Sequence, residues 1–215
     1  MESSASQALA YIRERLMSGE FAAGTRLTEE RLARDIGISR TPVREAIRTL
    51  VADGFLTFRP NAGAFVAEWS DEDIRQIFDL RTILESQIAE AAALAMTSAQ
   101  LAALEEIQDK LDRLNTERGA RALQERAALN RSFHAAIAQA SRKTRLAAAL
   151  NSAISMPIVQ QTFRRYSPRQ MKRSLAHHHE LLDAFRARDP QWARAVMTAH
   201  IRAALGALLH TGESK

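Results

Sequence analysis

The 215-residue chain contains no cysteine, which excludes disulfide bridges, thiolate metal sites and cysteine nucleophiles. Glycine and proline are scarce, with 8 and 5 residues, and this favours a mostly helical chain. No apolar run approaches the roughly 20 residues that a membrane-spanning helix requires. The first residues also lack the basic and apolar regions of a secretory signal. We therefore expect a cytoplasmic protein with no membrane partner.

The composition that remains is typical of a globular, mainly helical protein. Apolar residues make up 46% of the chain and charged residues 26%, and alanine, leucine, arginine and glutamate favour helices. The formal net charge is +5. Residues 1–69 nevertheless contain nine basic and nine acidic side chains, so the whole excess lies in residues 70–215. Any argument for nucleic-acid binding must therefore come from local patterns.

The chain is predicted to divide near residue 69. Two β-prone runs, 55–58 and 64–67, flank a Pro/Asn/Gly turn and predict a hairpin. Three helical patterns precede the hairpin, and they run from Ser4 to Met17, from Thr28 to Asp35, and from the N-cap Ser39 to a stop at Gly54. This order predicts a winged helix-turn-helix over residues 1–69.

Residues 70–215 have the period of helices almost throughout. The pattern is interrupted near 97–98, 118–119, 140–141, 166–168 and 189–190. These interruptions leave about six segments of roughly 18 to 25 residues, long enough for an antiparallel all-α bundle.

The third helix of the first domain carries two different stripes. Arg40, Arg44 and Arg48 recur every four residues, whereas Val43, Ile47 and Leu50 form an apolar stripe that can dock on the preceding helices. Arginines on a helix that enters the major groove contact guanine or phosphates. A merely solvated surface is the alternative. The predicted DNA-binding residues are those of this helix and of the hairpin tip: Ser39, Arg40, Thr41, Pro42, Arg44, Arg48, Asn61 and Gly63.

The segment from Leu27 to Ile47, with its Ser-Arg-Thr-Pro-Val-Arg-Glu-Ala core, resembles the signature of the GntR family of bacterial transcription regulators. Flanking residues extend the resemblance over residues 5–68. It implies binding to double-stranded operator DNA as a homodimer, with Arg40, Thr41 and Arg44 reading or gripping the DNA.

Three histidines of the second domain are predicted to face its interior. His178 lies on an apolar stripe, and its two neighbours point about 100° to either side. If the chain turns at 189–190, His178 and His200 lie at nearly the same height on antiparallel helices. Asn130 lies one turn before His134. Together these residues predict a divalent metal site, and buried histidines that serve only the core are the alternative.

The second domain also resembles the FCD-type ligand-sensing domain of the fatty-acid-regulator branch of that family. The segments that carry this resemblance are Asp79-Leu80-Arg81…Glu85, Asn130…Phe133-His134 and His178…Asp189…His200. In metal-binding members an Asp and three His hold the ion, and these fall on Asn130, His134, His178 and His200. Asn stands where Asp is usual, so we expect a lower metal affinity.

Imidazole-rich sites suit Zn²⁺, Ni²⁺, Cu²⁺ or Fe²⁺, and of these we expect Zn²⁺ or Ni²⁺. The resemblance implies a small carboxylate effector that completes the metal shell. Arg81 is the candidate for binding that carboxylate, and an ion pair with Glu85 is its alternative role.

These features predict a transcription regulator, a repressor rather than an activator, whose operator affinity responds to the effector. One alternative is a metal-free sensor of an organic acid or acyl ligand. The other is a metal-dependent hydrolase tethered to DNA. Against a hydrolase, no Asp or Glu that could act as a general base occurs between Glu125 and Glu180.

Overall fold

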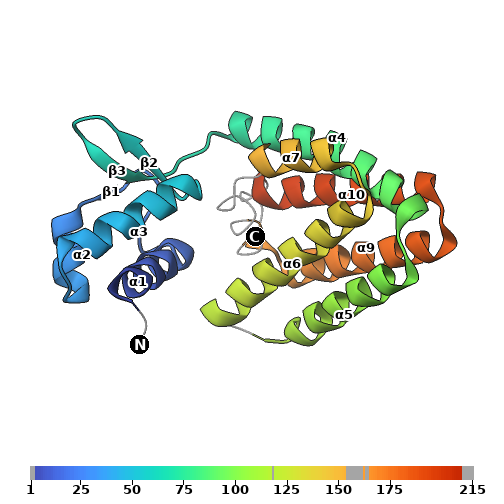
Figure 1. The fold of residues 1–215 in the computed structure, drawn as a ribbon, viewed down its shortest axis with the longest axis horizontal. Coiled ribbons are helices and arrows are strands. Elements are labelled where there is room, and N and C mark those ends of the chain that lie inside the picture. Colours follow the sequence, from blue (N-terminus) through green and yellow to red (C-terminus); the bar gives the residue numbers. More distant parts are fainter. Residues whose placement is uncertain (1–2, 118, 154–161, 163–164, 210–215) are drawn as a thin grey trace. The chain divides into compact units, whose positions relative to one another are not determined.

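The computed structural model describes residues 3–117, 119–153, 162 and 165–209 (Figure 1). These residues form two compact units, one ending at Ser70 and the other beginning at Asp71. The description below takes each unit by itself. No helix in the described ranges combines the length and the apolarity needed to cross a bilayer.

The first unit is a winged helix-turn-helix, as predicted. Its helices are α1 (Ser4–Ser18), α2 (Glu29–Ile36) and α3 (Arg40–Ala52), and its strands are β1 (Arg26–Leu27), β2 (Leu56–Arg59) and β3 (Gly63–Val66). β3 is the central strand, with β1 and β2 antiparallel on its two sides (Figure 1). The hairpin of β2 and β3 was predicted, whereas the two-residue strand β1 was not.

Local sequence explains where these helices begin and end. The hydroxyl of Thr28 accepts a hydrogen bond from the backbone N–H of Arg31 and caps α2. Gly37 ends α2 in the left-handed conformation, with φ of 78°. The core beneath the helices contains fully buried Ile12, Val43 and Leu50. This core fixes α3 against α1 and leaves the opposite face of α3 outside.

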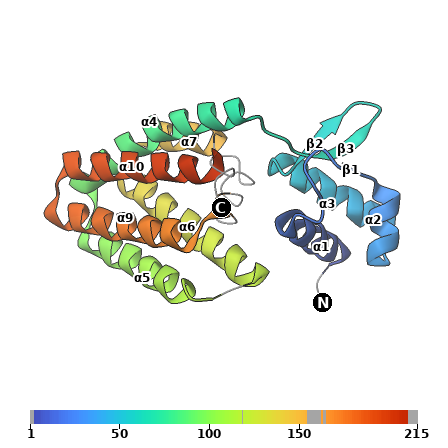
Figure 2. The same ribbon diagram turned by 180° about the vertical axis from the view of Figure 1, so that it is seen from behind.

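The second unit is an all-α bundle, again as predicted. Its described helices are α4 (Asp71–Ala95), α5 (Ser98–Leu114), α6 (Ala120–Ala140), α7 (Thr144–Ala153), α9 (Pro168–Ala187) and α10 (Pro190–Leu209). α10 lies against both α4 and α9, and α5 lies against α6 and α9 (Figure 2). The helix boundaries fall at the predicted interruptions. α5 and α7 are shorter than predicted, and most of the segment between α7 and α9 lies outside the described residues.

The bundle is held by its core, and ion pairs join its helices at the surface. Phe78, Phe133 and Leu181 are fully buried, and burying such a side chain contributes roughly 1.5–3 kcal/mol. Exposed ion pairs contribute much less, and here they connect neighbouring helices. The pairs are Arg202–Asp79 (2.6 Å) and Arg194–Glu90 (3.0 Å) between α10 and α4, and Arg186–Glu105 (2.6 Å) between α9 and α5.

Candidate DNA interface and candidate metal centre

Helix α3 presents the two stripes that the sequence predicts. Val43, Ala46, Ile47 and Leu50 are buried. Arg40, Arg44 and Arg48 are exposed on the other face, with 63% of the Arg40 side chain and 48% of the Arg44 side chain accessible. The arginine stripe is thus accessible to a partner as large as double-stranded DNA. Its contact with DNA remains a prediction.

The arginine stripe surrounds one carboxylate, Glu29, in the first turn of α2. Nε and Nη2 of Arg44 donate to the two oxygens of Glu29 at 2.8 and 2.7 Å. Nη2 of Arg40 lies 3.9 Å from the same carboxylate. The hydrogen bond from Arg44 and the nearby positive charges lower the pKa of Glu29, against the opposing effect of burial. Sequence reasoning missed this residue, although acids are common in a first helical turn.

Glu29, Arg40 and Arg44 line a groove of about 360 Å³ between α2, α3 and the wing. Phe58 borders this groove from strand β2 and is 64% exposed, which is unusual for a phenylalanine. Gly63 also borders it, with φ of 92°, and Asn61 has φ of 60° in the wing turn. Glycine and asparagine are the residue types that most readily adopt such positive φ angles. The wing tip is therefore formed as the sequence predicts.

The remaining predicted DNA-binding residues lie at the amino end of α3. Ser39 is its N-cap by backbone conformation, but its hydroxyl makes no capping hydrogen bond. Thr41 and Pro42 follow in the first turn, where backbone N–H groups, which Pro42 lacks, have no partner within the helix. This end of the helix suits phosphate oxygens.

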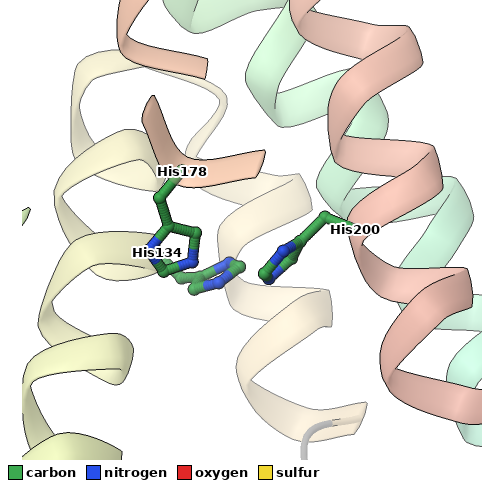
Figure 3. Close-up of side chains that lie close together, drawn as sticks. All are labelled: His134, His178 and His200. Atoms are coloured by element: carbon green, nitrogen blue, oxygen red, sulfur yellow. The ribbon is translucent and has the colours of Figure 1, made fainter. Parts of the chain in front are cut away.

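In the bundle, the structure brings together His134 of α6, His178 of α9 and His200 of α10 (Figure 3). The ring centroids are 5.7 Å apart for His134 and His178, 5.2 Å for His134 and His200, and 4.8 Å for His178 and His200. One potential ligand nitrogen of each ring lies within 4.8 Å of the others. His178 and His200 are almost wholly buried. The predicted choice of His178 as the inward residue among its neighbours is confirmed.

Each of these rings has a buried nitrogen that lacks a hydrogen-bond partner. Nδ1 of His134 lies 2.6 Å from Oε2 of Glu85, and Nδ1 of His178 lies 2.9 Å from Oε1 of Gln108. The Nε2 atoms of both rings and Nδ1 of His200 have no partner. Buried polar atoms are rarely left this way unless a ligand or an ion serves them. A carboxylate or amide behind the imidazole is also the usual arrangement around a metal-bound histidine.

Gln108 itself is oriented by a further contact. Its Nε2 donates to Oδ1 of Asp112 at 3.0 Å, so its carbonyl oxygen faces His178. The oxygen accepts the Nδ1 proton of His178, which leaves the Nε2 lone pair directed away from Gln108. Gln108 is fully buried. Its place between Leu104 and Leu111 on the buried face of α5 is the sequence signal that could have identified it.

Glu85 connects the cluster to Arg81. Nε of Arg81 donates to Oε1 of Glu85 at 2.8 Å, and both side chains are buried. Burial by itself would raise the pKa of Glu85, but the charges of Arg81 and His134 and their hydrogen bonds lower it to about 2. Glu85 is thus an anion that holds both Arg81 and His134 in place. The ion pair weighed as the alternative role of Arg81 is present.

Asn130 is buried on α6, one helical turn before His134. A direct role for its amide oxygen stays a prediction.

Comparison with known families decides what kind of protein carries these sites. Residues 4–66 match the pattern described as "Bacterial regulatory proteins, gntR family", and residues 76–203, more than half of the chain, match the FCD domain. The chain belongs to the GntR family. Its GntR and FCD regions coincide with the two units of the structure.

GntR relatives resemble the chain over most of its length. A "Probable D-xylose utilization operon transcriptional repressor" of Paenarthrobacter nicotinovorans is 29% identical over 96% of this chain and 89% of the relative. A regulator from an unstable DNA locus of Streptomyces ambofaciens is 31% identical over 89% and 79% of the two chains. The solved structure of Escherichia coli McbR/YncC has 25% identity and a TM-score of 0.72, and covers 97% of this chain and 98% of that one.

GntR membership separates the hypotheses that the sequence left open. GntR proteins and the named relatives are DNA-binding transcription regulators. The chain is therefore a transcription regulator with a ligand-binding FCD domain, and the hydrolase alternative is wrong.

The histidine cluster predicts how the stability of this GntR protein depends on pH. Burial, reinforced by neighbouring histidines, lowers the pKa of His178 and His200 well below 6.5. Below pH 6.5 the unfolded chain therefore binds protons that the folded chain does not, and the free energy of unfolding should fall. Each histidine contributes a slope of about 1.4 kcal/mol per pH unit until its folded-state pKa is reached.

Urea unfolding of chelator-treated protein at pH 7.5, 6.5 and 5.5 measures this slope. His200→Ala should reduce it by about half, whereas His179→Ala, which removes an exposed histidine, should leave it unchanged. A stability that stays constant between pH 6.5 and 5.5 would contradict the expectation.

Proposed function

We propose that the chain is a homodimeric repressor whose operator affinity is controlled by a small carboxylate effector and a divalent metal ion. Residues 1–69 form the DNA-binding domain in this proposal, and residues 70–215 form the effector-binding and dimerisation domain. The protein acts in the cytoplasm on double-stranded operator DNA. DNA is contacted by the arginine stripe of α3, by the hydroxyl and backbone groups at the start of that helix and by the wing tip.

The observation that carries the metal proposal is the convergence of three imidazoles, two of them buried and one partly buried, each with a buried nitrogen that has no partner. Neutral imidazole is a good ligand for Zn²⁺ and Ni²⁺. The lowered pKa values of His178 and His200 keep both rings neutral near pH 7. His134, His178 and His200 would hold the ion, with Asn130 as the fourth protein ligand. Bound there, a divalent ion supplies a positive charge that attracts a carboxylate.

Arg81 supports the carboxylate part of the proposal. It is buried beside the cluster and reaches His134 through the shared carboxylate of Glu85. An effector carboxylate that engages the guanidinium would compete with Glu85 or add to its pairing, and in both cases it would alter the support of His134. This contact gives the effector a physical route to the metal ligands.

The dimer and its repressor activity rest on other observations. Leu80, Ile83 and Leu94 of α4 are exposed large apolar side chains, and a second copy of the chain would remove them from water. The name of the Paenarthrobacter nicotinovorans relative describes a repressor. A dimer places two α3 helices on the two halves of a palindromic operator.

Native mass spectrometry of protein purified without chelator or metal-affinity resin tests the assembly and the metal together. We expect a dimer with about one Zn²⁺ or Ni²⁺ per subunit after incubation with each ion. Titration of the metal-loaded dimer with malate, succinate, gluconate and alanine at fixed salt then tests the effector class. A protein that takes up neither ion refutes the metal site, and operator affinity that responds to none of these acids refutes the carboxylate effector.

Asn130→Asp is expected to tighten metal binding. The substitution adds a negative charge beside a dication, and at 4 Å even one pair of unit charges attracts by about 4 kcal/mol at an effective dielectric constant of 20. Part of that is lost to desolvation, so we expect a Kd for Zn²⁺ lower by about tenfold or more. Competition with a fluorescent zinc chelator measures it. Asn151→Asp adds the same charge at an exposed position of α7 and should change nothing; equal Kd values for all three proteins would remove Asn130 from the ligand set.

A further inference from the structure

The ion pair between Glu29 and Arg44 determines which side of the Arg44 guanidinium can meet DNA. A guanidinium has five N–H donors in one plane. Glu29 takes one from Nε and one from Nη2, at 2.8 and 2.7 Å. The three remaining donors include one from Nη1 and one from Nη2 that point along the same edge. This free edge has the spacing needed to pair with O6 and N7 of guanine.

We propose that Glu29 is a positioning residue for base recognition: it holds Arg44 so that only the Nη1–Nη2 edge is presented to a guanine of the operator. The inference rests on the proposed DNA-reading role of Arg44 and adds a specificity-determining residue to it. Glu29 itself touches no base in this arrangement.

The surroundings of Glu29 favour this role over a merely surface ion pair. The Glu29 side chain is only 26% exposed, whereas Glu30 next to it is 71% exposed. Both oxygens of Glu29 are used by the fork of Arg44, which fixes the plane of the guanidinium as well as its position. The pair also borders the groove between α3 and the wing. A free arginine at this place would lose side-chain conformational freedom on binding, and the paired one has already lost it.

Glu29 also brings a negative charge toward the phosphates of DNA. Its presence therefore weakens sequence-independent binding. In this arrangement Glu29 lowers the affinity for all DNA and increases the specificity for one base. Removing it should raise non-specific binding and lower specificity at the same time.

Glu30→Gln is the matched control for Glu29→Gln. Both acids lie in the first turn of α2 and border the same groove, so each substitution removes one negative charge from the same region. Glu30 is within ion-pair distance of Arg34, at 3.8 Å, and not of the arginine stripe. A difference in base preference between the two variants therefore isolates the contact with Arg44.

The experiment uses the full-length protein and an operator obtained by selecting random duplexes with the wild type. Each guanine of the half-site is replaced in turn, and Kd is measured at one salt concentration. Arg44→Ala first identifies the guanine whose preference depends on Arg44. We expect Glu29→Gln to reduce the preference at that position by about tenfold while binding to random DNA strengthens. Glu30→Gln should strengthen both equally and keep the preference.

Three results are decisive. Full preference for the guanine in Glu29→Gln, with the preference lost in Arg44→Ala, overturns the positioning role but leaves the reading role of Arg44 intact. Preference retained in Arg44→Ala overturns both. If Glu29→Gln in an Arg44→Ala background lowers the preference further, Glu29 acts independently of Arg44 and the inference is wrong.

Discussion

Arg44→Ala is expected to cause a large loss of specific operator binding while leaving the dimer and the helix content intact. One bidentate contact to guanine accounts for about 1–3 kcal/mol of discrimination. Because a dimer makes this contact twice, the operator Kd should rise by roughly thirtyfold at the least. The side chain is half exposed and its ion pair lies at the surface, so the variant should melt near the wild-type temperature. Fluorescence anisotropy with a labelled operator measures the loss.

Arg34→Ala is the control for the lost positive charge. Arg34 lies on α2 with its side chain 76% exposed, and its carboxylate partner is Glu30. Its removal should weaken operator and random DNA by the same small factor. If Arg44→Ala also weakened both DNAs equally, the residue would be a phosphate contact and its assignment to base recognition would be wrong.

His178→Ala is expected to remove the metal from the bundle. The wild type should carry about one ion per subunit, and the variant close to none after the same dialysis. The loss should also appear in stability, because an ion at a thousand times its Kd stabilises the folded state by about 4 kcal/mol. For a chain of this size that corresponds to a rise in Tm of about 8–16 °C. The added ion should therefore raise the Tm of the wild type and not that of the variant.

His179→Ala is the neighbouring control, because His179 is exposed and its Nε2 contacts Asp112. It should bind the ion as the wild type does. His178→Ala leaves a buried space and lowers stability by itself, so His200→Ala is measured as well, and the comparison uses the shift caused by the ion rather than the absolute Tm. Full metal occupancy in His178→Ala or in His200→Ala would show that the ion binds elsewhere.

The sequence predicted the elements that repeat a pattern and missed those that do not. The amphipathic helices, the wing turn with Asn61 and Gly63, and the inward choice of His178 all follow from periodicity or residue type. Strand β1 has two residues, too few for any alternation to be visible. Its pairing with β3 depends on a strand almost forty residues later in the chain, which no local pattern contains.

The candidate site shows the same division. Heights along antiparallel helices can be counted, and so His178 and His200 could be brought together from sequence. From the sequence, Glu85 could be paired only with Arg81, which lies four residues before it on α4. Its contact with His134 joins two different helices and was not predictable from spacing. Gln108 supports His178 from 70 residues away. Contacts of this kind depend on how helices rotate about their axes, and that rotation is decided by packing.

We expect the third strand of the small sheet to affect the kinetics of operator binding. β3 is hydrogen-bonded on both edges, and the turn before β1 adds the bonds Gly24 N–H to Val66 O and Val66 N–H to Thr25 O. An isolated two-stranded hairpin is only marginally stable in water, so we expect the added bonds to β1 and its turn to keep this wing ordered before DNA arrives. Binding to DNA then does not include the unfavourable entropy of ordering the wing. The association rate constant should then vary with ionic strength through electrostatic steering, without a slow step for folding of the wing.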